Sequence, residues 1–168
     1  MTIGNESFKQ VTSFSINTLL SIETIEIGDD CFKSTATDIR FNSFPELISL
    51  KIGRSSFYDG MNNQPINNVF QVHNNSKLLS IEIDEYSFST FGSTFSISSL
   101  PLLQNLTIGS IENDSNNFMN VASFSISGIN LYYDIYYIGL PNLETLIIGR
   151  GSFSGSTKFS ITSIIQFI

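Results

Sequence analysis

Few side chains in this chain have the type and spacing that chemistry requires. His73 is the only histidine and lies in the segment Val72-His73-Asn74. A catalytic role would need a nucleophile and an orienting acid beside it, and no other feature of the sequence points to this segment. We therefore expect His73 to be an exposed loop residue directly after a strand. The chain is expected to have no catalytic residues and no enzymatic activity.

Cys31 is the only cysteine, so the chain has no internal disulfide and no cysteine-based metal site. In the other copies of the repeat described below, its place is taken by small hydroxyl residues: Ser7, Ser56, Ser87 and Ser152. A residue that alternates with serine is expected to be a small packing residue rather than a reactive thiol.

Neighbouring acids could in principle bind a cation. They occur as Asp29/Asp30, Asp84/Glu85 and Glu112/Asp114. A calcium loop needs several oxygen ligands at a set spacing, and no segment supplies that pattern. We expect solvated turn acids, with weak adventitious Ca²⁺ binding as the alternative. The sequence predicts no cofactor and no built metal site.

The elements that would position these residues come from a short repeat. Each copy is anchored on an isoleucine, and 24 residues separate Ile3 from Ile27. The anchors are Ile3, Ile27, Ile52, Ile83, Ile108 and Ile148, followed by Gly in every copy except at Asp84. A phenylalanine comes five residues later at Phe8, Phe32, Phe57, Phe88 and Phe153, and an insertion moves it to Phe118 in the fifth copy.

Two apolar tracts in each copy alternate with a period of two residues, which indicates strands. The first ends at the anchor, as in Leu47/Leu50/Ile52. The second alternates an aromatic and a β-branched residue: Phe14/Ile16, Ile39/Phe41, Phe70/Val72, Phe95/Ile97, Phe124/Ile126 and Phe159/Ile161. Self-similarity of this kind indicates a stacked-coil protein. We predict a mainly β solenoid of about six coils with two parallel sheets and little helix, formed by residues 1–168 as a single repeat array.

The glycine after each anchor is interpreted as a tight turn that needs φ > 0, which only Gly adopts cheaply. Proline precedes several first strands, at Pro45, Pro101 and Pro141, and should stiffen the corner there.

The spacing Leu-x-x-Leu-x-Ile, followed by Gly and Phe, resembles leucine-rich repeats. It is most similar to the BspA-like repeats of surface proteins in some bacteria and anaerobic protists. The resemblance covers essentially the whole chain and implies a scaffold for protein contacts. Glycine stands where standard leucine-rich repeats carry an Asn or Cys ladder. This departure favours a flatter coil of two sheets over a horseshoe with convex helices.

Composition narrows the classes of partner. The chain has 8 basic and 15 acidic residues and a formal net charge of −7. Nucleic acids and anionic membrane surfaces both attract clustered Lys and Arg, so we expect neither as a partner. No run of about 18 apolar residues occurs, which predicts no membrane insertion in this segment.

Two surfaces are candidates for contact with a protein partner. One is the outward side of the first strands, with Glu26, Lys51, Glu82, Thr107 and Ile147; a plain solvated face is the alternative. The other is the Tyr-rich insertion with Tyr132, Tyr133, Tyr136 and Tyr137. Tyrosine offers a large contact area at low entropic cost, although the insertion could instead fold back over the edge of the coils.

The sequence thus favours a non-enzymatic scaffold for protein–protein interaction. The alternative is a structural spacer, a segment of a larger surface or receptor-like protein. The last stretch, Ile161 to Ile168, is strongly apolar where a soluble array should carry a polar cap. We therefore expect the chain to be a piece of a longer array that lacks its end caps, or a truncated gene product.

Overall fold

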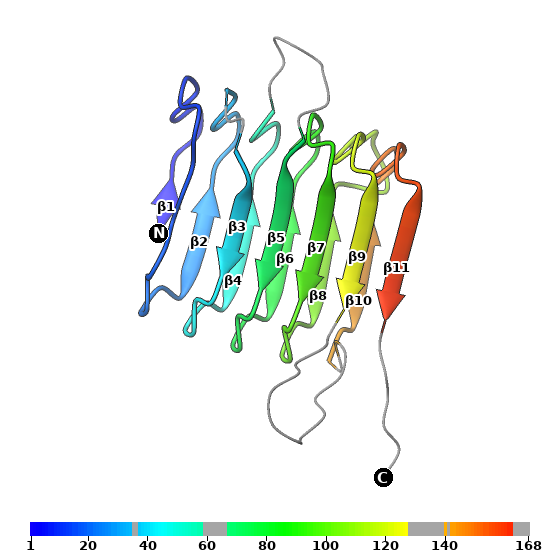
Figure 1. Cartoon of the computed structure of the whole chain (residues 1–168). Helices are drawn as coiled ribbons and strands as arrows, with labels where there is room; N and C mark the ends of the chain where they lie inside the picture. The colour runs from blue at the N-terminus through cyan, green and yellow to red at the C-terminus, as the bar shows by residue number, and fades with distance from the viewer. Residues whose placement is uncertain (35–36, 59–66, 128–139, 141, 163–168) are drawn as a thin grey trace.

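The chain folds into two parallel β-sheets that lie face to face. The computed structural model describes residues 1–34, 37–58, 67–127, 140 and 142–162. The chain alternates between the sheets, so the strands of one sheet run opposite to those of the other (Figure 1). No helix occurs among the described residues. The expectation of a mainly β solenoid with two parallel sheets is confirmed.

The first sheet collects the strands that end at the anchor isoleucines. In spatial order they are β1 (Thr2–Ile3), β2 (Thr24–Ile27), β4 (Ser49–Ile52), β6 (Ser80–Ile83), β8 (Asn105–Ile108) and β10 (Thr145–Ile148). The pairing holds each anchor beside the next, as for Ile27 and Ile52. Alternate side chains face the core, because β-strand side chains point to opposite faces in turn. Ile25 and Ile27 are buried, while Thr24 and Glu26 are exposed.

The second sheet collects the aromatic tracts. Its strands are β3 (Ile39–Asn42), β5 (Val69–His73), β7 (Thr94–Ser98), β9 (Ser123–Ser127) and β11 (Lys158–Thr162). The tract of Phe14 and Ile16 was predicted to be a strand and is not one. Its Phe14 N–H donates to the Thr37 side-chain oxygen at 3.3 Å instead of to a backbone carbonyl. The predicted hydrophobic alternation is present there, but the backbone ladder is not.

The phenylalanines of the repeat stack in one continuous row between the sheets. Successive rings of Phe8, Phe32, Phe57, Phe88, Phe118 and Phe153 are nearly parallel, with centroids 4.8 to 5.3 Å apart. Phe57, Phe88 and Phe118 are fully buried. Phe8, at the end of the row, is 55% exposed. The row that the spacing predicts is confirmed, and the insertion before Phe118 does not break it.

A second aromatic row comes from the second sheet. Phe70, Phe95, Phe124 and Phe159 stack in the same way, with centroids 4.9 to 5.2 Å apart. The rings of the two rows meet edge to face, as Phe95 does with Phe118. Offset-stacked and edge-to-face pairs are the favourable aromatic arrangements. The core therefore consists of two interlocked aromatic rows flanked by the aliphatic rows of the strands.

The positive φ that we predicted for the glycines after the anchors is confirmed at one of them and wrong at the others. Only Gly109 among them has a left-handed backbone, with φ +72°. At Gly53 a Cβ would lie 2.6 Å from the carbonyl carbon of Gly28 and 2.8 Å from the Asp29 nitrogen. At Gly149 it would lie 2.6 Å from the Ser110 nitrogen. At Gly53 and Gly149 glycine is therefore required because the backbones of neighbouring coils approach too closely for a side chain, whereas Gly4 meets nothing within 4 Å.

In each copy, the left-handed backbone conformation is instead adopted by the phenylalanine of the row and by the residue two positions before it. Phe32, Phe57 and Phe88 have φ of 54°, 54° and 57°. A bulky residue rarely adopts this conformation, which costs about 1–3 kcal/mol. Burial of the ring in the aromatic row offsets that cost, since burying a Phe side chain contributes about 1.5–3 kcal/mol.

A buried polar ladder that the sequence analysis did not predict is also present. It lies directly before the phenylalanine row. Ser56 Oγ donates to the Gly28 carbonyl at 2.8 Å, and Ser87 Oγ donates to the Gly53 carbonyl at 2.8 Å. Asn117 Nδ2 donates in the same way to Asp84 O at 2.6 Å.

Candidate interaction surfaces

The predicted contact residues of the first strands lie in one outward row. The strand register aligns Thr2, Glu26, Lys51, Glu82, Thr107 and Ile147 across the first sheet. Glu26 and Glu82 are exposed, and Lys51, Thr107 and Ile147 are half-buried by their neighbours. Stacking thus brings side chains from the whole length of the chain onto one face. We call this row the charged row, after its three ionic members.

The charges of the charged row alternate in sign. Lys51 Nζ lies 3.2 Å from Glu82 Oε1, and Glu26 flanks Lys51 on its other side. The hydrogen bond to Glu82, followed by the attraction of that carboxylate, raises the pKa of Lys51 above its usual range. About half of each side chain in this pair remains exposed (45% and 51%). Such a pair contributes little to stability, so its charges remain available to a partner.

A row of small polar side chains borders the charged row. It comprises Thr24, Ser49, Ser80, Asn105 and Thr145, which the register aligns at the start of each strand. Ser80 Oγ donates to Ser49 Oγ at 3.2 Å. These short side chains leave the face flat. A partner could therefore approach the sheet closely along its full length.

The second sheet presents a face of hydroxyls and amides that we did not single out from the sequence. Gln71 Oε1 accepts from Arg40 Nη1 at 2.7 Å and from Asn42 Nδ2 at 2.8 Å. His73 is the last residue of β5 and not a loop residue. It is half-buried, with Nδ1 2.8 Å from Ser98 Oγ. His73 therefore belongs to a row of polar contacts between strands, and among the described residues its ring is bonded to the Ser98 hydroxyl rather than to a carboxylate.

Cys31 is a packing residue, as we predicted. It is fully buried, and its Sγ donates to the Gly4 carbonyl at 3.2 Å. Its backbone N–H donates to Ser56 Oγ at 3.1 Å. Burial raises the pKa of the Cys31 thiol, with the nearby Asp29 and Asp30 adding to the effect. The Cys31 thiol therefore donates to a backbone carbonyl of the preceding coil, as the serine hydroxyls of the ladder do in other coils.

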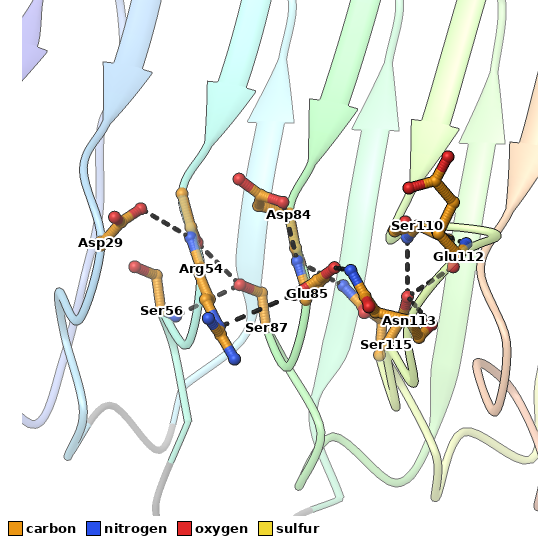
Figure 2. Close-up of polar contacts among 12 residues, drawn as sticks. Asp29, Arg54, Ser56, Asp84, Glu85, Ser87, Ser110, Glu112, Asn113 and Ser115 are labelled. Carbon is orange, nitrogen blue, oxygen red and sulfur yellow. Dashed lines mark hydrogen bonds and ion pairs between the residues drawn. The ribbon is translucent and has the colours of Figure 1, made fainter.

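The turns after the first sheet carry a connected set of polar groups, shown in Figure 2, which we call the turn edge. Arg54 links three coils. Its backbone N–H donates to Asp29 Oδ1 at 2.9 Å, and its Nε lies 3.7 Å from Glu85 Oε2. Its guanidinium group also lies 5.2 Å from the centre of the Tyr86 ring. Asn113, from the next insertion, donates to Glu85 Oε1 at 3.2 Å.

Two acids of the turns pair with cations. Asp30 pairs with Lys33, and Asp114 pairs with Arg150 at 3.1 Å. Only 13% of the Glu85 side chain is exposed. In the part of the chain that the structure describes, no group of three or more His, Cys, Asp or Glu side chains could hold a metal ion. The turn edge thus connects neighbouring coils.

The Tyr-rich insertion, with Tyr132, Tyr133, Tyr136 and Tyr137, lies outside the described residues. It stays a prediction. Within the described ranges, no helix is both long and apolar enough to cross a membrane.

Comparison of the chain with protein-family models, with curated proteins and with solved structures gives no match.

Proposed function

We propose that this protein is a non-enzymatic scaffold that binds a protein partner through the outward face of its first sheet. The observation that carries the proposal is the charged row. Its members come from strands far apart in the sequence, yet the register aligns them on one face. Repeat proteins commonly use such extended surfaces for recognition. We propose neither a nucleic acid nor a cofactor as a partner.

The charge pattern favours specificity over affinity. Glu26, Lys51 and Glu82 alternate in sign, followed by the neutral Thr107 and Ile147. A partner with the complementary order of charges would pair with all three ions, while a shifted partner would meet like charges. Complementary charges of this kind set register and association rate more than binding strength. The half-buried Ile147 supplies an apolar contact at one end of the row.

We further propose that the repeat is of the leucine-rich type and that the chain comprises six coils. The strand of each copy ends at the anchor isoleucine, which is the place that the Leu-x-x-Leu-x-Ile spacing predicts. The polar ladder beside the phenylalanine row supports the same class, since it satisfies backbone groups between coils. Neither argument identifies a partner.

Charge reversal of the charged row tests the proposed surface. The full chain is immobilised and exposed to a cross-linker with a cell extract, and cross-linked peptides are mapped by mass spectrometry. Lys51→Glu combined with Glu82→Lys inverts the order of the charges but keeps the net charge. We expect a protein that the parent chain retains through this face to be lost from this variant at equal protein concentration, with capture scored by the amount of that protein retained because the variant also lacks the Lys51 amine.

The matched control inverts a pair on the other sheet. Asp38→Arg with Arg40→Asp reverses the exposed pair Arg40–Asp38, whose nitrogen and oxygen lie 2.7 Å apart. This control should retain the partner. Equal capture by the parent chain and by both variants would contradict the proposal for the first sheet.

A structural spacer is the second candidate, and one observation favours it. Several exposed ion pairs join residues of adjacent coils, such as Lys51–Glu82 and Lys77–Glu46. These charges already have partners within the chain. If neither the charged-row variant nor replacement of Tyr132, Tyr133, Tyr136 and Tyr137 by Ser changes any specific cross-link, the spacer is the better account.

A further inference from the structure

Two exposed ion pairs cross the junction between β4 and β6 in the first sheet. They are Glu46–Lys77, at the corner before the strands, and Lys51–Glu82, in the charged row. The coil of β4 thus carries an acid and then a base in chain order, and the coil of β6 carries a base and then an acid. The two neighbouring coils therefore present the same pattern of charges with the signs inverted.

Two apolar side chains lie between these charges along the chain. Ile48 directly precedes β4 and Leu79 directly precedes β6, and the Leu79 N–H donates to the Ile48 carbonyl at 2.9 Å. Ile48 is 39% exposed, and Leu79 is half-buried. The small side chains of Ser49 and Ser80 follow them and leave the face flat. The junction thus presents an apolar centre with opposite charges on either side.

The four ions are paired within the chain and still accessible to a second partner. The side chains of Lys77 and Glu46 are 52% and 43% exposed, and those of Lys51 and Glu82 are 45% and 51% exposed. A Lys ammonium has several donors, and a carboxylate has several acceptor sites. Each group can therefore keep its present partner and take another group of opposite sign from a second molecule.

This part of the face is complementary to itself. A two-fold axis that runs along the strands, between β4 and β6, would place the β6 coil of a second copy over the β4 coil of the first. The opposed residues would then be Glu46 with Lys77, Lys51 with Glu82, and Ile48 with Leu79. Each contact would form twice, because in an isologous contact residue i meets j and residue j meets i.

The same axis avoids like charges in the charged row. It places Glu26 opposite the neutral Thr107, and beyond the strands it places Arg54 opposite Glu85. An axis through β4 would instead set Lys51 against its own copy, and an axis through β6 would oppose two glutamates in the same way. Since complementary charges fix the register of a contact, the junction of β4 and β6 is the favoured position.

We propose that the outward face of the first sheet binds a second copy of this chain, as a two-fold dimer about the junction of β4 and β6. The inference rests on the proposed function, because it uses the same face and names its partner. Stacked sheets lie about 10 Å apart, and the short side chains of Ser49 and Ser80 beside the axis allow that approach. The contact combines a small apolar centre with exposed ions, so the dimer is weak and salt weakens it further.

Two variants with charges of a single sign test the pairing. Lys51→Glu with Lys77→Glu makes all four ions negative, and Glu46→Lys with Glu82→Lys makes all four positive. Exposed ion pairs contribute little to stability, so both variants should fold, which far-UV circular dichroism verifies. Sedimentation velocity of the full chain at low salt, under reducing conditions, measures dimer formation as concentration rises. We expect the parent to dimerise, each variant to bind itself at least about thirtyfold more weakly, and an equimolar mixture of the two variants to dimerise at least as well as the parent.

The charge-swapped variant, Lys51→Glu with Glu82→Lys, tests the direction of the axis. In two copies of this variant, positions 51 and 82 still oppose each other with opposite signs, so it should dimerise like the parent. Against a fluorescently labelled parent copy, like charges meet at both positions. Mixed dimers should therefore be at least about tenfold weaker than either self-dimer. An axis across the strands would set position 51 against Glu46, and the swapped variant would then stay monomeric.

The matched control is Lys33→Glu with Arg40→Glu, which changes the net charge as much as the all-negative variant and breaks two exposed pairs away from this face. It should dimerise like the parent. The proposal is overturned by a monomeric parent, by a monomeric mixture of the single-sign variants, or by a swapped variant that does not bind itself. A monomeric parent that still captures a different protein, lost from the swapped variant, would refute this dimer and leave the proposed function standing. A monomeric parent with equal capture by all variants would refute both.

Discussion

Ser87 and Gly53 are joined by a buried hydrogen bond, in which the serine hydroxyl donates to the glycine carbonyl at 2.8 Å. The same hydroxyl accepts the backbone N–H of Ser56 at 3.2 Å. One side-chain atom therefore satisfies two backbone groups of the preceding coil. Buried backbone groups without partners are costly, so this atom makes close stacking of the two turns possible.

Removing that hydroxyl should destabilise the stack. In Ser87→Ala the Gly53 carbonyl and the Ser56 N–H lose their buried partner, which we expect to cost about 1–3 kcal/mol of unfolding free energy. Urea denaturation followed by circular dichroism measures the change. Ser96→Ala, on the outward side of β7, is the control and should stay within about 0.5 kcal/mol of the parent. Equal effects of the two substitutions would contradict the role of the ladder.

The two glycines Gly53 and Gly4 offer a matched test of close backbone approach. At Gly53 a Cβ meets backbone atoms at 2.6 and 2.8 Å, whereas at Gly4 it meets nothing within 4 Å. Gly53→Ala should therefore destabilise the chain by about 1–3 kcal/mol through overpacking. Gly4→Ala should be neutral or slightly stabilising, because alanine restricts the unfolded chain. Thermal or urea unfolding of both variants gives the comparison, and a neutral Gly53→Ala would refute the steric explanation.

Position along the aromatic row should decide the cost of losing a ring. Phe88 is fully buried between Phe57 and Phe118, with centroids 4.8 Å away on both sides. Phe88→Ala should cost about 3–5 kcal/mol through lost burial and the cavity that it leaves. Phe8→Ala, at the half-exposed end of the same row, should cost much less. Both residues have a left-handed backbone, so the comparison isolates packing from backbone conformation.

The thiol of Cys31 should be nearly inert in the folded chain. It is fully buried, and burial raises its pKa above the ordinary value of 9.0. An aromatic disulfide reagent should therefore modify it at a rate set by unfolding, because the thiolate is the reactive form. Fast modification of the folded chain at neutral pH would contradict this placement.

The raised pKa of Cys31 also predicts that the stability of the folded chain depends on pH. The unfolded thiol ionises near pH 9.0, and the folded thiol only at higher pH. Between these values the folded state binds the proton that the unfolded state has lost, so stability should fall as pH rises above 9. In Cys31→Ser this part of the slope should disappear, while the new hydroxyl can take the place of the thiol in the ladder. Urea midpoints measured from pH 7 to 10.5 would show the difference.

Much of this fold could be predicted because the repeat places equivalent residues at the same position in successive coils. The spacing of Leu50 and Ile52 gave strand periodicity, and the recurring phenylalanine gave the aromatic row. The alignment of Glu26, Lys51 and Glu82 on one face could be predicted in the same way, because each precedes its anchor isoleucine by one residue. These features depend only on residues within one copy and on parallel stacking, which the self-similarity itself indicates.

Other features depend on contacts between copies, and local reasoning assigned them wrongly. The glycine at Gly53 was attributed to its own φ, whereas the cause is the backbone of Gly28 in the preceding coil. The polar ladder was not predicted, because only the glycine position was compared with a ladder. The sharing of one place by Cys31, Ser56 and Ser87 was the signal that could have located it. The Arg54 contacts of the turn edge depend on how far long side chains reach, which spacing does not specify.

The register that aligns each anchor with the next has a consequence for the gene. Because the junctions of the first sheet all align one anchor isoleucine with the next, unequal crossing-over that adds or deletes a whole repeat would leave that row of isoleucines continuous. The molecule could then become longer or shorter by one coil at a time during evolution. The outward residues of each added coil would be free to diverge.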